Sequence, residues 1–349
     1  MYDQGNACIA VDAMGSDKGP SEMVAAVKMA LETVQDLDPI ILVGKEEVLA
    51  PLVREQGIEN HPKLSIFNAS EIIEMGDKPL QALRQKKDAS MIRAIELVKD
   101  KKARVVVSCG NTGTLMAAGT IKLRTMDGLE RPALATVMPH KTGHYILIDA
   151  GANPQAKAEH IAHNAILGSA YARTVLKIAK PRVGLLTIGT EEGKGTDLTN
   201  ASHTYLKSLG DVINYSGPIE GFQLFENVVD VVVCDGFTGN IVLKTCESLF
   251  KLLKDFAGEE LRKNPLRQMG YLMSKGAFDA IKHQLNPDRY GGAPLLGLKG
   301  TILKAHGSSN KEAVMNAIRI GHEIIRKDLN THILEDIEAA NTKIYDLDN

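Results

Sequence analysis

Five apolar runs along the chain each lead directly into a turn rich in Gly, Asp, Asn and Thr. The runs are Ile9–Val11, Val105–Val107, Tyr145–Ile148, Val183–Ile188 and Val228–Val233. Aliphatic runs without polar alternation are typical of strands buried on both faces of a parallel sheet. Several intervening segments carry the wider spacing of apolar residues that is typical of helices. The alternation predicts an α/β fold whose five turns share the carboxyl edge, where proteins of this class bind ligands.

The turn between Val105 and Gly119 has the composition of an anion cradle. Gly110 and Gly113 allow a tight backbone with outward N–H groups, and the positive end of the next helix follows them. Asn111 and Thr112 add side-chain donors. A single turn of this kind is also an ordinary strand-to-helix connection, so the prediction of a binding site depends on the recurrence of the pattern.

The other turns supply one obvious cation and several further hydrogen-bonding groups. Lys194 stands between two glycines and can approach a phosphate closely, although a flexible surface lysine is the alternative. Asn240 or Asn111 can donate to a developing oxyanion. The sequence lacks G-x-G-x-x-G, the P-loop pattern and G-x-S-x-G, so neither a dinucleotide fingerprint nor a serine nucleophile elbow is present.

Two other candidates for chemistry have structural alternatives. Cys109 follows an apolar strand and is either a nucleophile or, as we expect, a buried packing thiol. His160 and His163 have a spacing that hints at a metal, but no further ligand accompanies them, and we expect a solvated helix face. The polar segment 74–79 is either a mobile lid or, as we expect, a plain surface connection.

Composition limits the class of protein. A hydrophobic content of 44% in 349 residues supports a large core, and a net charge of −2 argues against a general nucleic-acid binder. The four cysteines contain no C-x-x-C pair, which predicts free thiols in a reducing compartment. No signal-peptide pattern and no apolar run near ~18 residues occurs, so we expect a cytoplasmic protein.

The segment from Leu249 to Leu285 alternates apolar and basic residues and predicts a helical hairpin inserted into the strand–helix order. It is either a core-facing helix pair or an exposed apolar tip that touches a membrane or a partner. The candidate contact residues are Arg262, Lys263, Leu266, Arg267, Leu272, Met273 and Lys275. We expect residues 334–349 to form an acidic tail that is poorly ordered at its end.

Seven motifs in order carry a family resemblance. They are Asp12-Ala-Met-Gly15, Gly110-Asn-Thr-Gly113, Asp149-Ala-Gly-Ala-Asn153, Glu191-Glu-Gly-Lys-Gly195, Cys234-Asp-Gly-Phe-Thr-Gly-Asn240, Gly292-Ala-Pro-Leu-Leu-Gly297 and Ala305-His-Gly-Ser-Ser-Asn310. From about Ile9 to Ile333 the chain resembles the bacterial phosphate acyltransferases. Ser16 stands where that family commonly has Gly, and Cys109 and Thr114 stand where small residues are usual, which argues against Cys109 as an obligatory nucleophile.

The resemblance implies a fold and a reaction. The fold is a three-layer α/β/α sandwich with a mostly parallel sheet, like phosphotransacetylase and isopropylmalate dehydrogenase. It implies a single catalytic domain over residues 7–333, with the hairpin 249–285 inserted in it, and a homodimer. The reaction moves a fatty acyl group from acyl carrier protein to inorganic phosphate. The acyl phosphate then serves a membrane glycerol-3-phosphate acyltransferase in phospholipid synthesis, and no cofactor or metal takes part.

The residues and the resemblance together assign roles at the site. Phosphate is already nucleophilic, so the site must hold it against the thioester carbonyl and stabilise the oxyanion. The predicted catalytic residues are Lys194, Asn240, Asn111 and Thr112. The predicted phosphate- and acyl-binding residues are Asp12, Gly15, Gly110, Gly113, Asn153, Gly195, Asp235, Gly239, His306, Ser308 and Ser309. A phosphate or acyl-ligand sensor without turnover is the alternative function, and a metal-dependent decarboxylating dehydrogenase is a weaker one.

We also expect this chain to associate peripherally with the inner face of the cell membrane. The basic and apolar residues of the hairpin are the pairing that interfacial helices use on anionic lipids. The same basic rim is suited to the acidic carrier protein. The sequence leaves open which of the two surfaces the hairpin binds.

Overall fold

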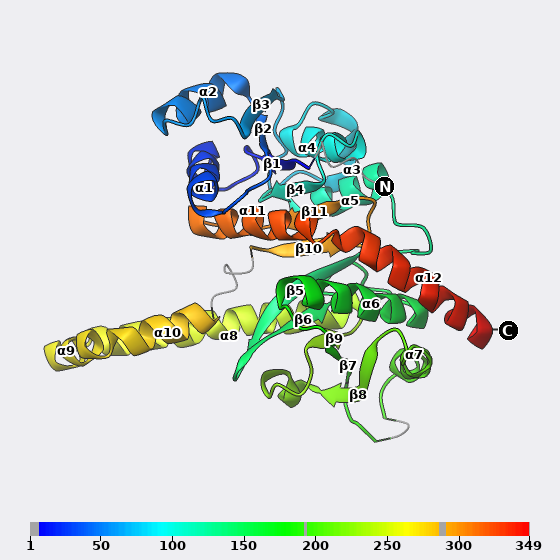
Figure 1. The fold of residues 1–349 in the computed structure, drawn as a ribbon. Coiled ribbons are helices and arrows are strands. Elements are labelled where there is room, and N and C mark those ends of the chain that lie inside the picture. Colours follow the sequence, from blue (N-terminus) through cyan, green and yellow to red (C-terminus); the bar gives the residue numbers. More distant parts are fainter. Residues whose placement is uncertain (1–6, 192–193, 286–290, 349) are drawn as a thin grey trace.

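The computed structural model of the chain describes residues 7–191, 194–285 and 291–348 (Figure 1). The described residues form one eleven-stranded sheet in the order β3-β2-β1-β4-β11-β10-β5-β6-β9-β7-β8. Antiparallel pairing occurs where β10 meets β11 and β5, and where β5 meets β6. The other neighbouring strands are parallel. The prediction of a mostly parallel α/β sheet is confirmed.

The strands are short and mostly buried. Their bounds are β1 (Ile9–Asp12), β2 (Ile40–Gly44), β3 (Leu64–Asn68), β4 (Val105–Ser108), β5 (Ala133–His140), β6 (Gly143–Ile148), β7 (Arg182–Thr187), β8 (Asn214–Glu220), β9 (Val231–Val233), β10 (Ala293–Leu296) and β11 (Thr301–Lys304). Each of the five apolar runs in the sequence contributes a strand, namely β1, β4, β6, β7 and β9.

The helices cover both faces of the sheet. Their bounds are α1 (Pro20–Thr33), α2 (Glu46–Glu55), α3 (Pro79–Gln85), α4 (Ser90–Lys99), α5 (Thr112–Leu123), α6 (Ala158–Val175), α7 (Asp197–Ser208), the 3-10 helix η2 (Gly221–Phe225), α8 (Gly236–Arg262), α9 (Pro265–Met273), α10 (Lys275–Leu285), α11 (Lys311–Arg326) and α12 (Leu329–Asp348).

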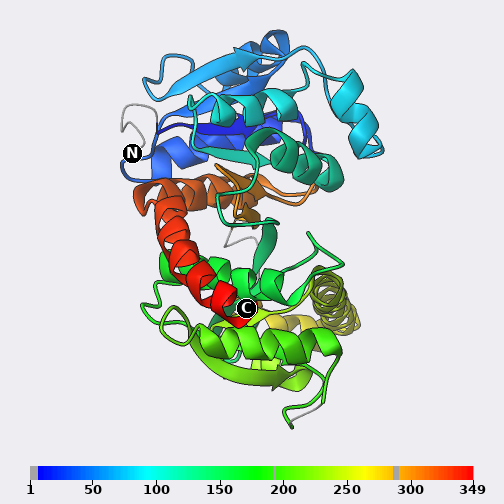
Figure 2. The ribbon, with the colours of Figure 1, turned by 90° about the vertical axis from the view of Figure 1, so that its right-hand side faces the viewer.

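Two clusters of buried residues show how the sheet lies between two layers of helices. In β4, Val105 and Val107 lie in the cluster that α1, α6, α11 and α12 cover, whereas Val106 lies in the cluster that α4 and α5 cover. Successive residues of a strand point to opposite faces, so an unbroken aliphatic run fills both layers. The sheet order divides the molecule into a first half, with β1–β4, β10 and β11, and a second half, with β5–β9. The first cluster extends from Ile9 to Ile344 and joins both halves. α12 runs from one half to the other along one side (Figure 2).

The structure of the chain after Leu334 corrects the prediction of a tail. The chain continues as helix α12, in which Ile333, Ile337, Ala340 and Ile344 are buried. These residues recur at intervals of three or four, so they share one helix face. Glu335, Asp336 and Glu338 lie between them, and the prediction of an acidic tail missed this helix because it considered composition and not the apolar period. The expected poor order concerned the end of the tail, and Asn349 lies outside the described residues.

The buried helix α6 corrects a second expectation. His160 and His163 are buried, not solvated, with only 6% and 7% of their surfaces exposed. The Nε2 atom of His160 lies 2.9 Å from Glu130 Oε2, and Nε2 of His163 lies 2.8 Å from Asn341 Oδ1. The two rings therefore find separate partners, one on the loop before β5 and one on α12.

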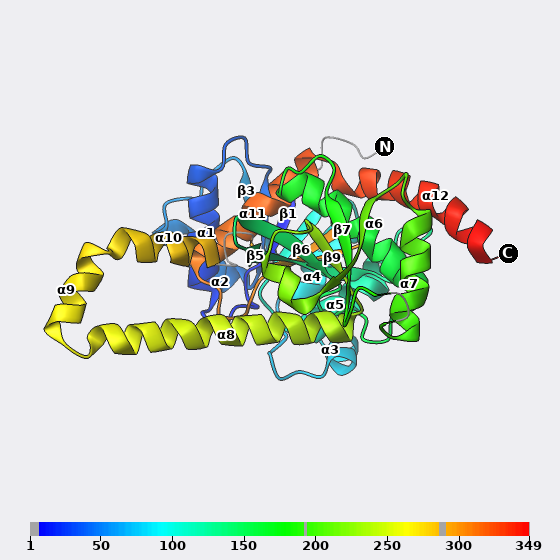
Figure 3. The same ribbon diagram turned by 90° about the horizontal axis from the view of Figure 1, so that it is seen from below.

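Helices α8, α9 and α10 form an arm that leaves the body of the molecule (Figure 3). The predicted hairpin starts at Leu249, but its first helix begins at Gly236 and runs without interruption to Arg262. Asn264 caps α9 by accepting a hydrogen bond from the Arg267 N–H, and Pro265 occupies its first turn. At the tip, Leu266, Leu272 and Met273 are 75%, 69% and 86% exposed, so this is not a core-facing helix pair.

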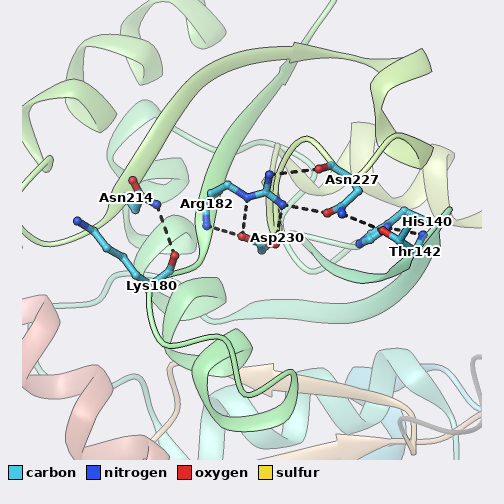
Figure 4. A network of polar contacts seen from close by, with 7 residues as sticks. All are labelled: His140, Thr142, Lys180, Arg182, Asn214, Asn227 and Asp230. Carbon is cyan, nitrogen blue, oxygen red and sulfur yellow. Dashed lines mark hydrogen bonds and ion pairs between the residues drawn. The ribbon is translucent and has the colours of Figure 1, made fainter.

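The amino edge of the second half is closed by a polar network (Figure 4). Arg182 Nε and Nη2 each donate to a carboxylate oxygen of Asp230 at 3.0 Å, and Nη2 also donates to Asn227 Oδ1 at 2.9 Å. Asn227 Nδ2 in turn donates to Thr142 Oγ1 at 2.8 Å. Burial raises the pKa of Asp230, but the guanidinium outweighs it and holds the pKa below its usual value. This edge joins β7, β9 and the β5–β6 turn.

Candidate active site

At the carboxyl edge of the first half, Asp12 joins three segments that are far apart in the sequence. Its carboxylate accepts hydrogen bonds of 2.6 Å from Ser90 Oγ at the start of α4 and from Ser108 Oγ at the end of β4. The side chain is fully buried, and burial raises its pKa while these hydroxyl groups oppose that shift. Asp12 therefore stabilises the frame of the cradle and is not itself exposed to a ligand.

Two glycines let the loops of this cradle pack directly on one another. A Cβ atom at Gly15 would lie 2.9 Å from Gly110 Cα and 2.6 Å from Asp12 Oδ2, so a side chain does not fit there. The Asp17 N–H donates to Gly307 O at 2.9 Å, which adds the loop after β11. The structure thus brings together the predicted loops at Asp12, Gly110 and His306.

In the loop after β11, His306 and Ser308 are exposed, whereas Ser309 is buried. His306 Nδ1 lies 2.8 Å from Ser308 Oγ and also accepts the Ser308 N–H at 3.2 Å. Asn310 then caps α11 by accepting the Ala313 N–H. His306 and Ser308 are the members of this loop that are open to a ligand.

Both the oxygen and the nitrogen of the Asn111 side-chain amide form hydrogen bonds within the protein. Its Oδ1 caps α5 by accepting the Thr114 N–H at 2.9 Å, and its Nδ2 donates to Met75 O at 2.7 Å and to Asp77 O at 3.2 Å. The geometry therefore gives this amide a positioning role and not the predicted donation to an oxyanion. Thr112, the next residue, is exposed and remains available.

The segment 74–79 lies on the cradle and is not a plain surface connection. Besides the Asn111 contacts, Pro79 Cγ would lie 2.9 Å from a Cβ at Gly113, and Met75 Cε would lie 2.6 Å from a Cβ at Gly307. The segment thus packs against two of the predicted binding loops.

In the second half, Asp149 organises the matching loop at the end of β6. Its Oδ1 accepts the N–H groups of Leu134, Gly151 and Ala152, and its Oδ2 accepts those of Asn153. Asn153 also donates through Nδ2 to Pro132 O at 2.6 Å. Asp149 and Asn153 are therefore structural supports of this loop.

Helix α8 begins in close contact with the Asp149 loop. A Cβ at Gly236 would lie 2.7 Å from Asn153 N, and a Cβ at Gly239 would lie 2.0 Å from Asp149 O. Asp235 caps the helix by accepting the Thr238 N–H at 2.9 Å. Asn240 follows with an exposed side chain beside Gly151, whose Cβ would be 3.4 Å from Asn240 Oδ1. These residues place an open amide at the positive end of a helix.

Lys194 lies on a separate loop after β7. Its side chain is exposed and forms an ion pair with Glu191 at 2.8 Å, and this hydrogen bond raises the pKa of Lys194. Gly195 adopts a φ of 111°, and its Cβ would lie 2.4 Å from Thr199 Oγ1. The structure does not bring Lys194 into the contacts described above, and residues 192 and 193 of its motif lie outside the described residues.

Sequence reasoning missed Lys304, the last residue of β11. It is partly buried, and its Nζ donates to Cys109 O at 3.2 Å and to Ala305 O. Burial lowers the pKa of Lys304. The available signal was its position, because it ends a strand immediately before the Ala305-His-Gly motif.

Cys109 occupies the core, as expected. It has no exposed surface, and its Sγ lies 3.9 Å from Met23 Sδ. Burial raises the pKa of this thiol to about 12, so it stays protonated at neutral pH. All four cysteines are free, which confirms the prediction from their spacing.

The described residues contain no group of three or more His, Cys, Asp or Glu side chains placed to hold a metal ion. Among the same residues, no helix is both long and apolar enough to cross a membrane. A cavity of about 370 Å³ lies at the amino edge beside Lys180, and one of about 310 Å³ lies under the arm beside Phe250.

The fold matches that of solved structures. The chain has the fold of the phosphotransacetylases, with a TM-score of 0.63 to one from Streptococcus pyogenes at 15% identity, covering 93% of this chain and 96% of that one. A branched-chain phosphotransacylase from Enterococcus faecalis gives a TM-score of 0.56 at 13% identity, with 91% and 99% covered. The expected α/β/α architecture is confirmed.

Sequence comparison then gives the family. A family model described as "Fatty acid synthesis protein" matches residues 7–332. A phosphate acyltransferase from Akkermansia muciniphila is 40% identical over 338 residues, covering 96% of this chain and 97% of its own length. One from Desulfitobacterium hafniense is 44% identical over 319 residues, with 91% and 93% covered. The chain belongs to the phosphate acyltransferase family.

Proposed function

We propose that this protein transfers a fatty acyl group from the thioester of acyl carrier protein to inorganic phosphate, reversibly forming an acyl phosphate for phospholipid synthesis. The observation that carries the proposal is the exposed Asn240 amide at the start of α8, fixed against the Asp149 loop by Gly236 and Gly239. Such a donor at a helix N-terminus is suited to an oxyanion. Membership of the phosphate acyltransferase family supports the same reaction.

The chemistry needs no covalent enzyme intermediate. A phosphate oxygen attacks the thioester carbonyl carbon, and the carbonyl oxygen becomes an oxyanion as the new C–O bond forms. Collapse of this tetrahedral species breaks the C–S bond, and the thiolate of the carrier leaves and takes up a proton. The buried, protonated Cys109 is consistent with direct attack by phosphate.

Each open side chain has a distinct proposed role. Asn240 and Thr112 donate hydrogen bonds to the oxyanion or to phosphate, and both are exposed at the carboxyl edge. His306 and Ser308 form the phosphate cradle, with Asn111 holding segment 74–79 beside it. Lys194 neutralises phosphate or the oxyanion, which requires it to exchange its surface ion pair with Glu191 for the substrate.

The test is release of the carrier-protein thiol as a function of phosphate concentration. With acyl carrier protein loaded with a fatty acid, we expect thiol release that requires phosphate and that yields one acyl phosphate per thiol. Binding of acyl carrier protein or phosphate without thiol release would support the sensor and overturn the proposal. Hydrolysis without acyl phosphate would overturn it as well.

The tip of the arm is the proposed contact with the anionic inner membrane surface. Leu266, Leu272 and Met273 are exposed there, near Arg262 and Lys275. Lys263 and Arg267 both pair with Glu260, so part of the basic charge is already neutralised. Each remaining basic residue near an anionic bilayer contributes about 1 kcal/mol, which supports reversible and salt-sensitive binding.

Two further partners belong to the same proposal. Helix α8 exposes Leu249, Leu252, Leu253 and Phe256 along the arm, an apolar face suited to a second copy in a homodimer. The basic residues of the arm are also suited to the acidic carrier protein. The localisation we propose is cytoplasmic and peripheral, with the acyl phosphate delivered to a membrane glycerol-3-phosphate acyltransferase.

A further inference from the structure

Lys304 joins the two loops that border the first-half cradle. Its Nζ donates to Cys109 O, just before Gly110, at 3.2 Å, and to Ala305 O, just before His306. An ammonium group has three N–H donors, so one donor is left after these two contacts. The donor belongs to a partly buried cation at the carboxyl end of β11.

Lys304 has no direct ion-pair partner in the part of the chain that the structure describes. Within the described residues, no carboxylate forms an ion pair with Lys304 at 4.0 Å or less. Asp12 is near enough to act on its charge, but the Asp12 carboxylate is occupied by Ser90 and Ser108. Asp17 also acts on it from a distance. A partly buried cation without a directly paired anion carries a desolvation cost, and a bound anion offsets that cost.

The positive charge of Lys244 on α8 also acts on Lys304. Burial is the largest cause of the lowered pKa of Lys304, and the positive charge of Lys244 on α8 lowers that pKa further. Lys244 lies one helical turn after Asn240 and therefore on the same side of α8. It pairs with Glu247 at 2.8 Å on the exposed surface.

We infer that Lys304 is the cation that binds the attacking inorganic phosphate, with one N–H group directed to a phosphate oxygen and Lys244 contributing positive charge from α8. The inference rests on the proposed function and names the phosphate subsite within it. It also assigns a separate role to Lys194, which lies on the loop after β7 and is left to act on the acyl side.

The test distinguishes phosphate binding by the charge of Lys304 from a role in holding the two loops together. Lys304→Gln keeps an amide that can donate to carbonyls but loses the charge, and Lys304→Arg keeps the charge. We expect the KM for phosphate in thiol release to rise about tenfold or more in Lys304→Gln, because a hydrogen bond to a charged group is lost. The KM for the acylated carrier protein is expected to stay nearly unchanged, and Lys304→Arg is expected to recover much of the phosphate affinity.

A matched control lies just before the same strand. Lys299 precedes β11, is exposed and pairs with Asp127 at 2.7 Å, so Lys299→Gln is expected to leave both KM values unchanged. A phosphate KM in Lys304→Gln equal to that of the wild type would overturn the inference. An equal rise in both KM values would also overturn it, because it would indicate only a support of the loops.

A binding measurement keeps the inference distinct from the proposed reaction. Inorganic phosphate is expected to raise the Tm of the wild type, and this shift is expected to be absent in Lys304→Gln and present in Lys299→Gln. If the wild type releases no thiol with phosphate, the proposed function fails, while this shift still tests Lys304. If Lys304→Gln does not fold, Lys244→Gln decides: an unchanged phosphate KM there would contradict the two-lysine site, and a raised one would support it.

Discussion

The carbonyl oxygen of Asp149 occupies the space where a side chain on Gly239 would begin, with only 2.0 Å between that oxygen and an ideal Cβ. Gly239 lies in the first turn of α8, and Asp149 directly follows strand β6. The contact fixes Asn240, the next residue, relative to the loop that Asp149 holds. The position of the proposed oxyanion donor thus depends on the absence of one methyl group.

Gly239→Ala is expected to lower the free energy of unfolding by about 1–3 kcal/mol, because the added methyl group forces α8 away from the Asp149 loop. Turnover is expected to fall more than tenfold, since Asn240 moves with the helix. Gly258→Ala is the matched control, because it lies in the same helix with no atom within 4 Å of its Cβ position. Urea unfolding and thiol release measure both effects. Normal turnover in Gly239→Ala would contradict the role of this contact.

Asn240→Ala and Lys194→Ala are each expected to reduce turnover by about 10²-fold or more while the fold remains intact. Both side chains are exposed, so their removal leaves no cavity in the core. Ser248→Ala, at another exposed position of α8, is the control and is expected to retain full activity. Near-normal rates in both variants would exclude these two residues from the chemistry.

Cys109→Ala is expected to retain most activity, since in the proposed reaction phosphate attacks the thioester directly. Loss of the buried sulfur contact with Met23 is expected to reduce stability by about 1 kcal/mol. Mass spectrometry of the enzyme mixed with acylated carrier protein is expected to find no acyl group on the chain. A trapped acyl-cysteine at this position would refute direct attack.

Replacing both Leu272 and Met273 with Glu is expected to abolish sedimentation with anionic vesicles, because both side chains are exposed at the tip of the arm. Phosphate-dependent transfer in solution is expected to remain nearly unchanged. Phe222→Glu, at an apolar position that is 70% exposed on the body, is the control and is expected to keep vesicle binding. Vesicle binding that survives the double change would reject the membrane contact, and failure of transfer in solution would point to the carrier protein instead.

Acidification below about pH 6.5 is expected to destabilise the protein through His163 and His140. Burial lowers the pKa of both side chains, so the unfolded chain takes up protons that the folded chain does not. The stabilising effect of the neutral rings is complete above the unfolded pKa and is lost as the pH falls. His163→Gln is expected to flatten the dependence of the urea midpoint on pH between about 7.5 and about 5.5. An unchanged slope would contradict this assignment.

Local patterns were sufficient to predict the sheet and its layers. Val105–Val107 is an aliphatic run whose residues alternate between two core clusters, and a pattern of this kind needs no long-range information. The tail was misjudged because its acidic residues hide an apolar period from Ile333 to Ile344 that is buried only when α12 packs on α6 and α7. His160 and His163 were misjudged for the same reason, since their partners lie on distant segments.

At the candidate site, the loops could be predicted but their internal contacts could not. Gly110, Asn111 and Gly239 are visible as turn residues in the sequence. That Asn111 Nδ2 donates to Met75 O, 36 positions away, depends on how segment 74–79 folds back. Lys304 Nζ reaches Cys109 O across 195 positions, and only the pairing of β11 with β4 brings the two together.

Helix α8 is one continuous helix that connects the candidate site to the tip of the arm. Its 27 residues span about 40 Å at 1.5 Å per residue, with Asn240 in the second turn and the arm tip beyond its far end. Whatever binds the tip therefore fixes the orientation of Asn240 and its distance from that surface. One extra residue inserted in the exposed part of the helix would turn the tip by about 100° relative to the reacting groups. In the proposed reaction, the length of this helix would set how far from the surface bound by the tip the acyl phosphate is released.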